Sequence, residues 1–162
     1  MNKLLTLLVA SLTIVAIGCQ NGPKKPDDLP NLYPVTIKVV YDDGSPVADA
    51  QVALRNPNSG GGRTWNLAGV TDATGTLVLK TDGNWPGAPA GTYQAMVTKE
   101  VPGEAEGDPD SSDYGAKTGT RYVDLKYGDP TTSGLSVEVK EGENNVELNV
   151  GEKKEETFKM LG

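Results

Sequence analysis

Residues 34–54, PVTIKVVYDDGSPVADAQVAL, decide the fold of this chain. Apolar and polar side chains alternate on both sides of the central DDGSP, with the period of two that is typical of strands with one buried face. Asp43-Gly44 readily takes the positive φ angles of a tight turn, and Pro46 cannot donate a ladder hydrogen bond. The stretch therefore predicts two strands joined by a turn. Their inward side chains are Val35, Ile37, Val39 and Tyr41 in the first strand and Ala50, Val52 and Leu54 in the second.

The same alternation recurs along most of the remaining chain, and helical periodicity is hard to find. Runs of Gly, Pro, Asp and Asn between the apolar segments are read as turns and loops, and Glu141–Asn144 is expected to close a hairpin between the last two strands. Seven short strands at this spacing predict an all-β fold, a single seven-stranded antiparallel β-sandwich of the transthyretin-like or immunoglobulin-like kind. The five further strands are expected at 64–71, 76–81, 92–99, 134–140 and 145–150.

The ends of the chain differ in composition from this β region. Residues 1–18 are expected to be a cleaved signal peptide, and 19–31 a flexible tether, because its Pro, Lys and Asp residues offer too little apolar surface to offset chain entropy. The β-sandwich domain is expected at 32–151. Within it, 101–132 is predicted to be a long irregular loop, either functional or disordered, and 152–162 a charged C-terminal tail that frays.

Residues 1–19 have the order of a secretory signal: a charged start, an apolar stretch from Leu4 to Ile17, then Gly18 and the chain's one cysteine, Cys19. The apolar stretch is shorter than the roughly 20 residues that span a bilayer, so a retained transmembrane anchor is the weaker alternative. Ala16-Ile17-Gly18-Cys19 resembles the lipobox of bacterial lipoprotein precursors. The resemblance implies that acyl chains such as palmitate anchor Cys19, which becomes the new N-terminus. Ala16 stands where leucine is usual, so ordinary secretion of an unlipidated chain stays open.

These features predict a location at the cell envelope. Gln20 is not the aspartate that retains many lipoproteins in the inner membrane, which favours the outer membrane. The expected partners are the membrane, through the lipid anchor, and an unknown envelope protein or glycan. The formal net charge of −7 disfavours association with polyanions, so nucleic acid is not expected as a partner.

Three turn motifs together resemble the carboxypeptidase regulatory-like domain, a transthyretin-like sandwich that also occurs in small bacterial lipoproteins. They lie at 43–52, 71–75 and 89–93, and residues 127–135 resemble the closing segment of the lipoprotein members. Asp49 departs from the pattern, since the family commonly has glycine there. The resemblance implies a non-catalytic domain with a display role.

The residue inventory argues against catalysis. The chain has no histidine, which removes the commonest general base and zinc ligand, and its aspartates cluster in turns, where they are expected to bond their own backbone. We therefore expect no enzyme activity, no catalytic residue, no cofactor and no metal. Calcium is the more plausible ion, through Asp108, Asp110 and Asp113, but their spacing matches no complete calcium loop.

Six aromatic residues raise a second possibility, carbohydrate binding through exposed rings. Trp85, between Asn84 and Pro86 in a predicted loop, is the best candidate ligand-binding residue, although a loop tryptophan more often packs over the end of a sandwich. The sequence thus predicts a lipid-anchored, non-enzymatic β-sandwich module of the cell envelope with a structural or protein-interaction role, and a carbohydrate-binding module as the alternative. The other aromatic residues considered are Trp65, Tyr93, Tyr114, Tyr122 and Tyr127.

Overall fold

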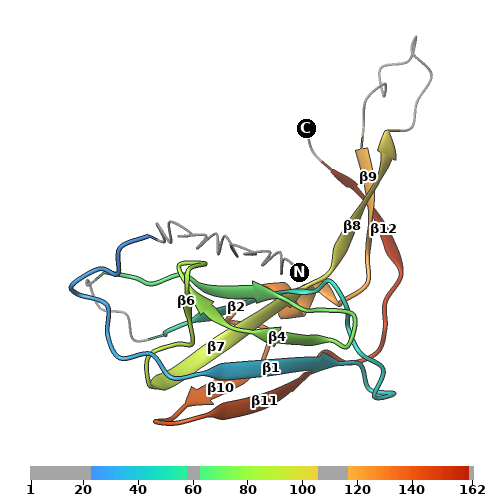
Figure 1. Ribbon diagram of the computed structural model, residues 1–162. Helices are drawn as coiled ribbons and strands as arrows, with labels where there is room; N and C mark the ends of the chain where they lie inside the picture. The colour runs from blue at the N-terminus through green and yellow to red at the C-terminus, as the bar shows by residue number, and fades with distance from the viewer. Residues whose placement is uncertain (1–22, 58–62, 106–116, 161–162) are drawn as a thin grey trace, which may run out of the picture.

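The computed structural model describes residues 23–57, 63–105 and 117–160. The fold is all-β and sandwich-like (Figure 1). The one helical element among the described residues is the 3-10 turn η1, Leu125–Gly128, and no helix there is long and apolar enough to cross a membrane. The strands are β1 Val35–Val40, β2 Gln51–Arg55, β3 Leu67–Val70, β4 Thr76–Val78, β5 Lys80–Thr81, β6 Trp85–Pro86, β7 Gly91–Thr98, β8 Glu100–Ala105, β9 Lys117–Arg121, β10 Ser136–Val139, β11 Asn144–Asn149 and β12 Glu156–Met160.

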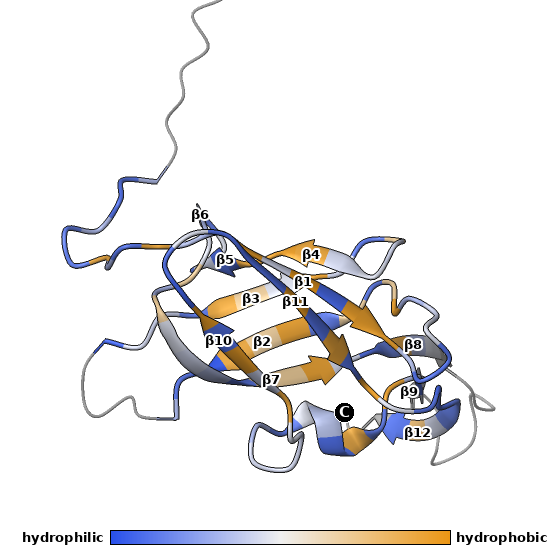
Figure 2. Ribbon diagram, turned by 90° about the horizontal axis from the view of Figure 1, so that it is seen from below, coloured by the Kyte–Doolittle hydropathy of each residue, from blue (hydrophilic) through white to orange (hydrophobic). Residues whose placement is uncertain are grey.

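Two sheets face each other across one core. The smaller sheet has the strand order β11-β1-β4 and the larger has β10-β7-β2-β3-β5-β6. Hydrophobic positions run along the strands of both sheets in Figure 2. The predicted inward residues of the first two strands are all buried, and Ile37, Val52 and Val97 are at most 1% exposed. The period-two pattern therefore identified the core faces of both sheets correctly.

The pairing of strands differs from the sequence expectation in two places. Residues 134–140 and 145–150 were expected to form a hairpin. Instead, β10 pairs antiparallel with β7 of the larger sheet, and β11 pairs parallel with β1 of the smaller sheet. The chain crosses from one sheet to the other at the turn, where Asn144 accepts from the Lys140 amide and donates to the Lys140 and Pro34 carbonyls. The sandwich is therefore not purely antiparallel.

Residues 76–81 also contribute one strand to each sheet. β4 pairs with β1, while β5 pairs antiparallel with β3. Alternation predicts which side chains point inward, but it does not reveal that the partner strand changes halfway. One predicted strand is therefore two short ones.

A third sheet, β12-β9-β8, projects from the sandwich as an arm (Figure 1). This corrects two expectations: residues 101–132 were predicted as an irregular loop and 152–162 as a fraying tail, yet β8 and β9 lie in the first and β12 in the second. The arm has few buried apolar side chains, so it lacks the alternation that reveals a core strand. Phe158 lies opposite Gly119 in the ladder, and its ring centroid is 4.7 Å from the Arg121 guanidinium carbon.

Among the apolar residues of the segment predicted as the loop 101–132, Val123 is buried, Tyr122 is half-buried and Leu125 is 64% exposed. Tyr127, which the sequence reading did not assign to the core, is buried instead. Leu125 points away because it begins the tight turn η1, in which Tyr127 is the buried residue.

Candidate functional site

Several predicted site residues lie outside the described part of the chain. They are Cys19, the candidate calcium ligands Asp108, Asp110 and Asp113, and the aromatic candidate Tyr114. Within the described ranges, no three His, Cys, Asp or Glu side chains gather as a metal site would require.

The described end of the predicted tether packs on the domain. Leu29 is buried, and the Tyr33 amide donates to the Ala88 carbonyl at 2.9 Å while the Ala88 amide donates back at 3.0 Å. Asp28 forms an ion pair with Arg63 at 3.2 Å. The last residues of the predicted tether therefore pack on the domain through side-chain contacts, in addition to the covalent connection at residue 32.

Gly87 makes this close approach possible. Its φ of 96° lies in the left-handed region that favours glycine, and a Cβ built there would collide with the Tyr33 carbonyl oxygen. Any larger residue would push the backbone at Tyr33 away.

Trp85 lies at this docked end. It is half-buried in β6, paired with Thr81, and it lines a hollow of about 440 Å³. Three of the six other lining residues belong to the predicted tether, so Trp85 lies beside this segment and not alone on a loop. The other residues around this hollow are Lys25, Leu29, Asn31, Leu32, Tyr33 and Pro86.

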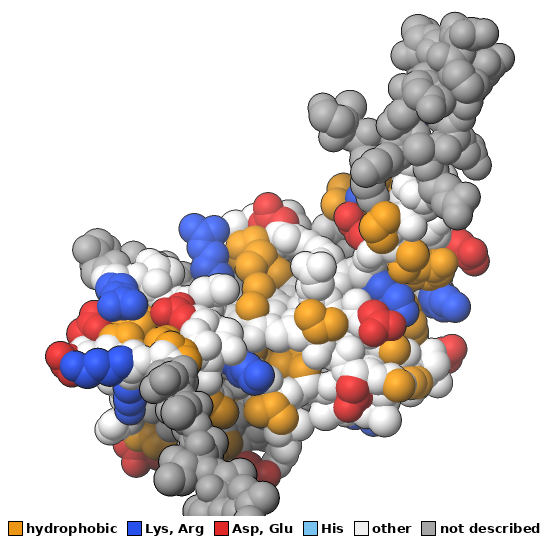
Figure 3. Space-filling model, turned by 45° about the horizontal axis from the view of Figure 1, so that its top comes forward, with side chains coloured by type: hydrophobic (Ala, Val, Ile, Leu, Met, Phe, Trp, Pro, Cys, Tyr) orange, Lys and Arg blue, Asp and Glu red, His pale blue; other side chains and the backbone are white. Residues whose placement is uncertain are grey.

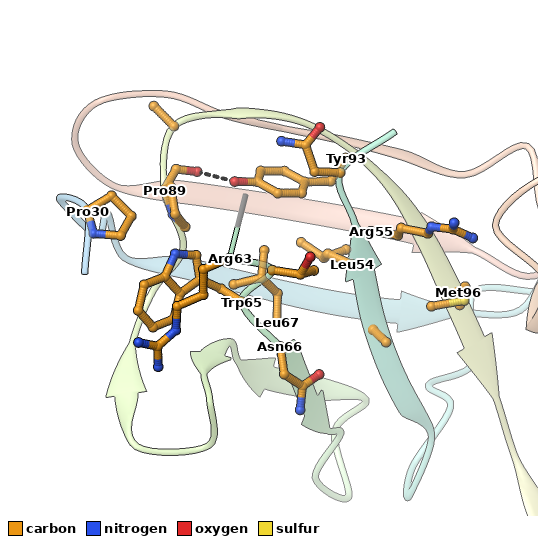
Figure 4. A pocket seen from close by; sticks show the side chains of 14 residues that line it. Pro30, Leu54, Arg55, Arg63, Trp65, Asn66, Leu67, Pro89, Tyr93 and Met96 are labelled. Carbon is orange, nitrogen blue, oxygen red and sulfur yellow. Dashed lines mark hydrogen bonds between the residues drawn. The ribbon is translucent and has the colours of Figure 1, made fainter. Parts of the chain in front are cut away.

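A larger groove, of about 550 Å³, opens beside Trp65 (Figure 4). β2 and β3 supply its floor through Leu54 and Leu67, and Tyr93 of β7 forms part of its wall, with its hydroxyl held by the Pro89 carbonyl at 2.8 Å. Burial raises the pKa of the Tyr93 hydroxyl, so this group stays a neutral donor and acceptor. We call this the Trp65 groove.

Two arginines line the Trp65 groove. The Arg63 guanidinium carbon lies 4.1 Å from the centroid of the Trp65 ring, and the same side chain pairs with Asp28 and, at 3.8 Å, with Asp82. Arg55 is exposed at the end of β2. The pKa of nearby Asp129 is lowered, chiefly by the hydrogen bond from the Thr131 hydroxyl and to a lesser degree by the charge of Arg55.

The Trp65 groove has the chemistry of a binding site for a small flat or ring-shaped ligand. Aromatic and aliphatic groups offer a stacking surface, and the guanidinium and amide groups offer hydrogen bonds. Among its described lining residues there is no Asp or Glu, so no pair of carboxylates is in place there for general acid and base catalysis.

The structure adds Trp65 to the candidates beside Trp85, which stays a prediction. Trp65 was expected inside a strand, but it precedes β3 and is half-buried against the core. The signal that could have favoured it is the spacing Arg63-Thr64-Trp65, which puts a cation beside an aromatic ring on the same side of an extended chain.

Comparison of the chain with models of known protein families, with curated proteins and with solved structures gives no match.

Proposed function

We propose that the protein is a lipid-anchored, non-enzymatic β-sandwich module of the cell envelope, with a structural or protein-interaction role. The observation that carries the proposal is the order of the N-terminal segments. A signal-like stretch ends at Cys19, and nine residues later, at Asp28, the chain already pairs with Arg63 of the domain. A lipid on Cys19 would need no protein contact to hold the chain at a membrane, since two or three acyl chains suffice.

The resemblance of the turn motifs to carboxypeptidase regulatory-like domains supports the same proposal. Asp49, where that family commonly has glycine, has a φ of 54°, so the departing residue keeps the left-handed conformation that a glycine takes readily. A non-catalytic role agrees with the chemistry of the groove, in which Arg, Trp and Tyr side chains are suited to binding.

The test of the anchor is metabolic labelling with a radioactive fatty acid in a lipoprotein-processing bacterium, followed by membrane fractionation. The wild-type chain is expected to carry label and to sediment with membranes, whereas Cys19→Ala should carry none and stay soluble. Ser11→Ala, within the apolar stretch, is the matched control and should behave as wild type. A wild-type chain that is secreted without label would contradict the proposal.

Carbohydrate binding is the second candidate function, and the Trp65 groove is the observation that favours it. Its test is affinity electrophoresis of the soluble domain through gels that contain neutral or uronic-acid polysaccharides. Retardation is expected to fall at least tenfold in Trp65→Ala and to persist in Trp85→Ala, which changes an equally half-buried tryptophan outside the groove. Equal mobility of wild type and Trp65→Ala in every gel would remove this candidate.

A further inference from the structure

Because the end of the tether packs on the domain, only the residues between Cys19 and the first contact with the domain can extend toward a membrane. We call this segment the leash. The first described residue with a side-chain contact to the domain is Asp28, which pairs with Arg63, and it lies nine residues after Cys19. A segment of that length spans at most about 31 Å when fully extended and on the order of 17 Å as a flexible chain. A lipid on Cys19 would therefore keep the hollow within this distance of the bilayer.

The sandwich and the arm together are longer than the leash. β7 begins beside the tether, three residues after the Tyr33–Ala88 pair, and its eight residues run from there to the base of the arm (Figure 1). At about 3.3 Å per residue, β7 covers about 26 Å and the six residues of β8 cover about 20 Å more. The far end of the arm therefore lies beyond the reach of the leash while the tether stays packed on the domain.

The contacts that hold the tether lie at its C-terminal end. They comprise the burial of Leu29, the Asp28–Arg63 ion pair and, just after the tether, the two-way backbone pairing of Tyr33 with Ala88. Gly87 reserves the space for that pairing. Several contacts would have to break together before the leash lengthened.

The surface at the tether end suits lipid headgroups. The hollow is lined by two aromatic residues, Tyr33 and Trp85, and by the exposed cation Lys25, with Lys24 beside it. Trp and Tyr favour the boundary between water and lipid, and Lys meets the phosphates of that layer. No Asp or Glu occurs among the described residues that line this hollow, but Asp27 and Asp28 are exposed in the same segment, and burial together with the nearby Glu141 carboxylate raises the pKa of Tyr33. Charges of both signs are mixed on the face that Figure 3 shows.

We propose that the hollow around Trp85 is the membrane-facing surface of the protein, in contact with phospholipid headgroups, and that the arm β8-β9-β12 points away from the bilayer. This inference rests on the proposed lipid anchor at Cys19 and adds an orientation to it. It assigns the arm and the outer end of the sandwich as the part of the molecule that meets other envelope components.

The test measures energy transfer from single sites on the lipidated protein to an acceptor dye attached to lipid. The protein is reconstituted in vesicles of phosphatidylethanolamine and phosphatidylglycerol. Because lipidation consumes the thiol of Cys19, the chain's one cysteine, a donor dye can be placed on Asn31→Cys at the tether end or on Val101→Cys in the arm. Both native side chains are exposed, so neither change disturbs the core.

Transfer from position 31 is expected to exceed that from position 101 several-fold. A matched variant with a twenty-residue Gly-Ser insertion after Gln20 keeps the anchor but lengthens the leash, and the difference should shrink toward equality. Vesicle flotation, measured on the same samples, reports the anchor separately. Equal transfer, or stronger transfer from position 101, in protein that floats with the vesicles overturns the orientation alone. Protein that does not float overturns the anchor and the orientation with it.

Discussion

Thr71 shows how one buried hydroxyl holds a strand connection in place. It is 2% exposed; its hydroxyl donates to the Val47 carbonyl at 2.6 Å and accepts from the Ala50 amide at 2.8 Å. These bonds satisfy two backbone groups next to the start of β2. A buried polar group that loses its partner costs about 1–3 kcal/mol.

We therefore expect Thr71→Val, which keeps the shape but removes the hydroxyl, to lower the free energy of unfolding by about 2–4 kcal/mol. Thr71→Ser retains the hydroxyl and should cost about 1 kcal/mol for the lost methyl group. Urea denaturation of the two variants and wild type measures both values. Equal losses in the two variants would show that the hydroxyl contributes nothing.

Gly87 gives a second prediction at the scale of one residue. Gly87→Ala should expose the Tyr33 amide to hydrogen exchange, because the new Cβ would collide with the Tyr33 carbonyl oxygen and separate it from Ala88. Backbone strain adds about 1–2 kcal/mol of destabilisation. Gly83→Ala is the matched control, since Gly83 has a φ of 71° but open space where its Cβ would lie. The two variants should lose similar stability from strain, but only Gly87→Ala should lose protection at Tyr33.

The candidate site was only partly predictable from its residues. The sequence supplied the aromatic candidates, but the burial of each one depends on a segment distant in the chain. Residues 25–33 cover Trp85, and no local pattern in the Trp85 loop shows this. The Trp65 side chain is half-buried because one face of its ring contacts the exposed Arg63 side chain and is not covered by a second sheet.

The strands themselves were more predictable than their partners. Alternation identified the inward faces of β1, β2 and β7, since each strand's own side chains decide which face is buried. It could not predict the parallel pairing of β1 with β11, which joins residues more than 100 positions apart. It also missed β9 and β12, whose sequences KTGTR and ETFKM offer few apolar side chains.

The arm depends on one cross-strand cluster rather than on a core. The Arg121 side chain is 14% exposed; it donates to Glu100 at 2.9 Å, lies 3.7 Å from Glu156 and stacks on Phe158. Phe158 lies over Gly119, which is buried although it has no side chain. The packing of the Phe158 ring on Arg121 and Gly119 thus stabilises the arm in place of a hydrophobic core.

Phe158→Ala should therefore loosen the arm without unfolding the sandwich. We expect a local loss of about 1–2 kcal/mol, from the apolar area and the cation–π contact together, with faster amide exchange in β9 and β12 and unchanged exchange in β1. Thr157→Ala, in the same strand but with its side chain on the opposite face, is the control. Faster exchange throughout the domain would contradict the independence of the arm.

Across the whole molecule, three turns repeat one hydrogen-bonding unit. Asp43, Asp72 and Asp129 each accept, through one carboxylate oxygen, from the amide and hydroxyl of the Ser or Thr two residues later. These bonds, with the hydroxyl bond as the largest cause, lower the pKa of each carboxyl. The stabilisation is present above the unfolded pKa of about 3.9 and is lost as the pH falls through the lower folded value.

The free energy of unfolding should accordingly decrease as the pH drops below about 4. The triple variant Asp43→Asn, Asp72→Asn, Asp129→Asn should be less stable at neutral pH and should show a flatter acid dependence, measured as urea midpoints against pH. Asp42→Asn, which removes an exposed carboxylate next to the first of these turns, is the matched control for the loss of one negative charge at neutral pH. A triple variant with an unaltered slope would refute this assignment.

The proposed attachment of the protein to a membrane depends on the modification at Cys19. The most direct test is the intact mass of the protein purified from the membranes of a lipoprotein-processing bacterium. We predict a chain that starts at Cys19 and carries the added mass of a diacylglyceryl group, with or without a third acyl chain. A chain that starts elsewhere, or that starts at Cys19 with a free thiol, would contradict the lipid anchor.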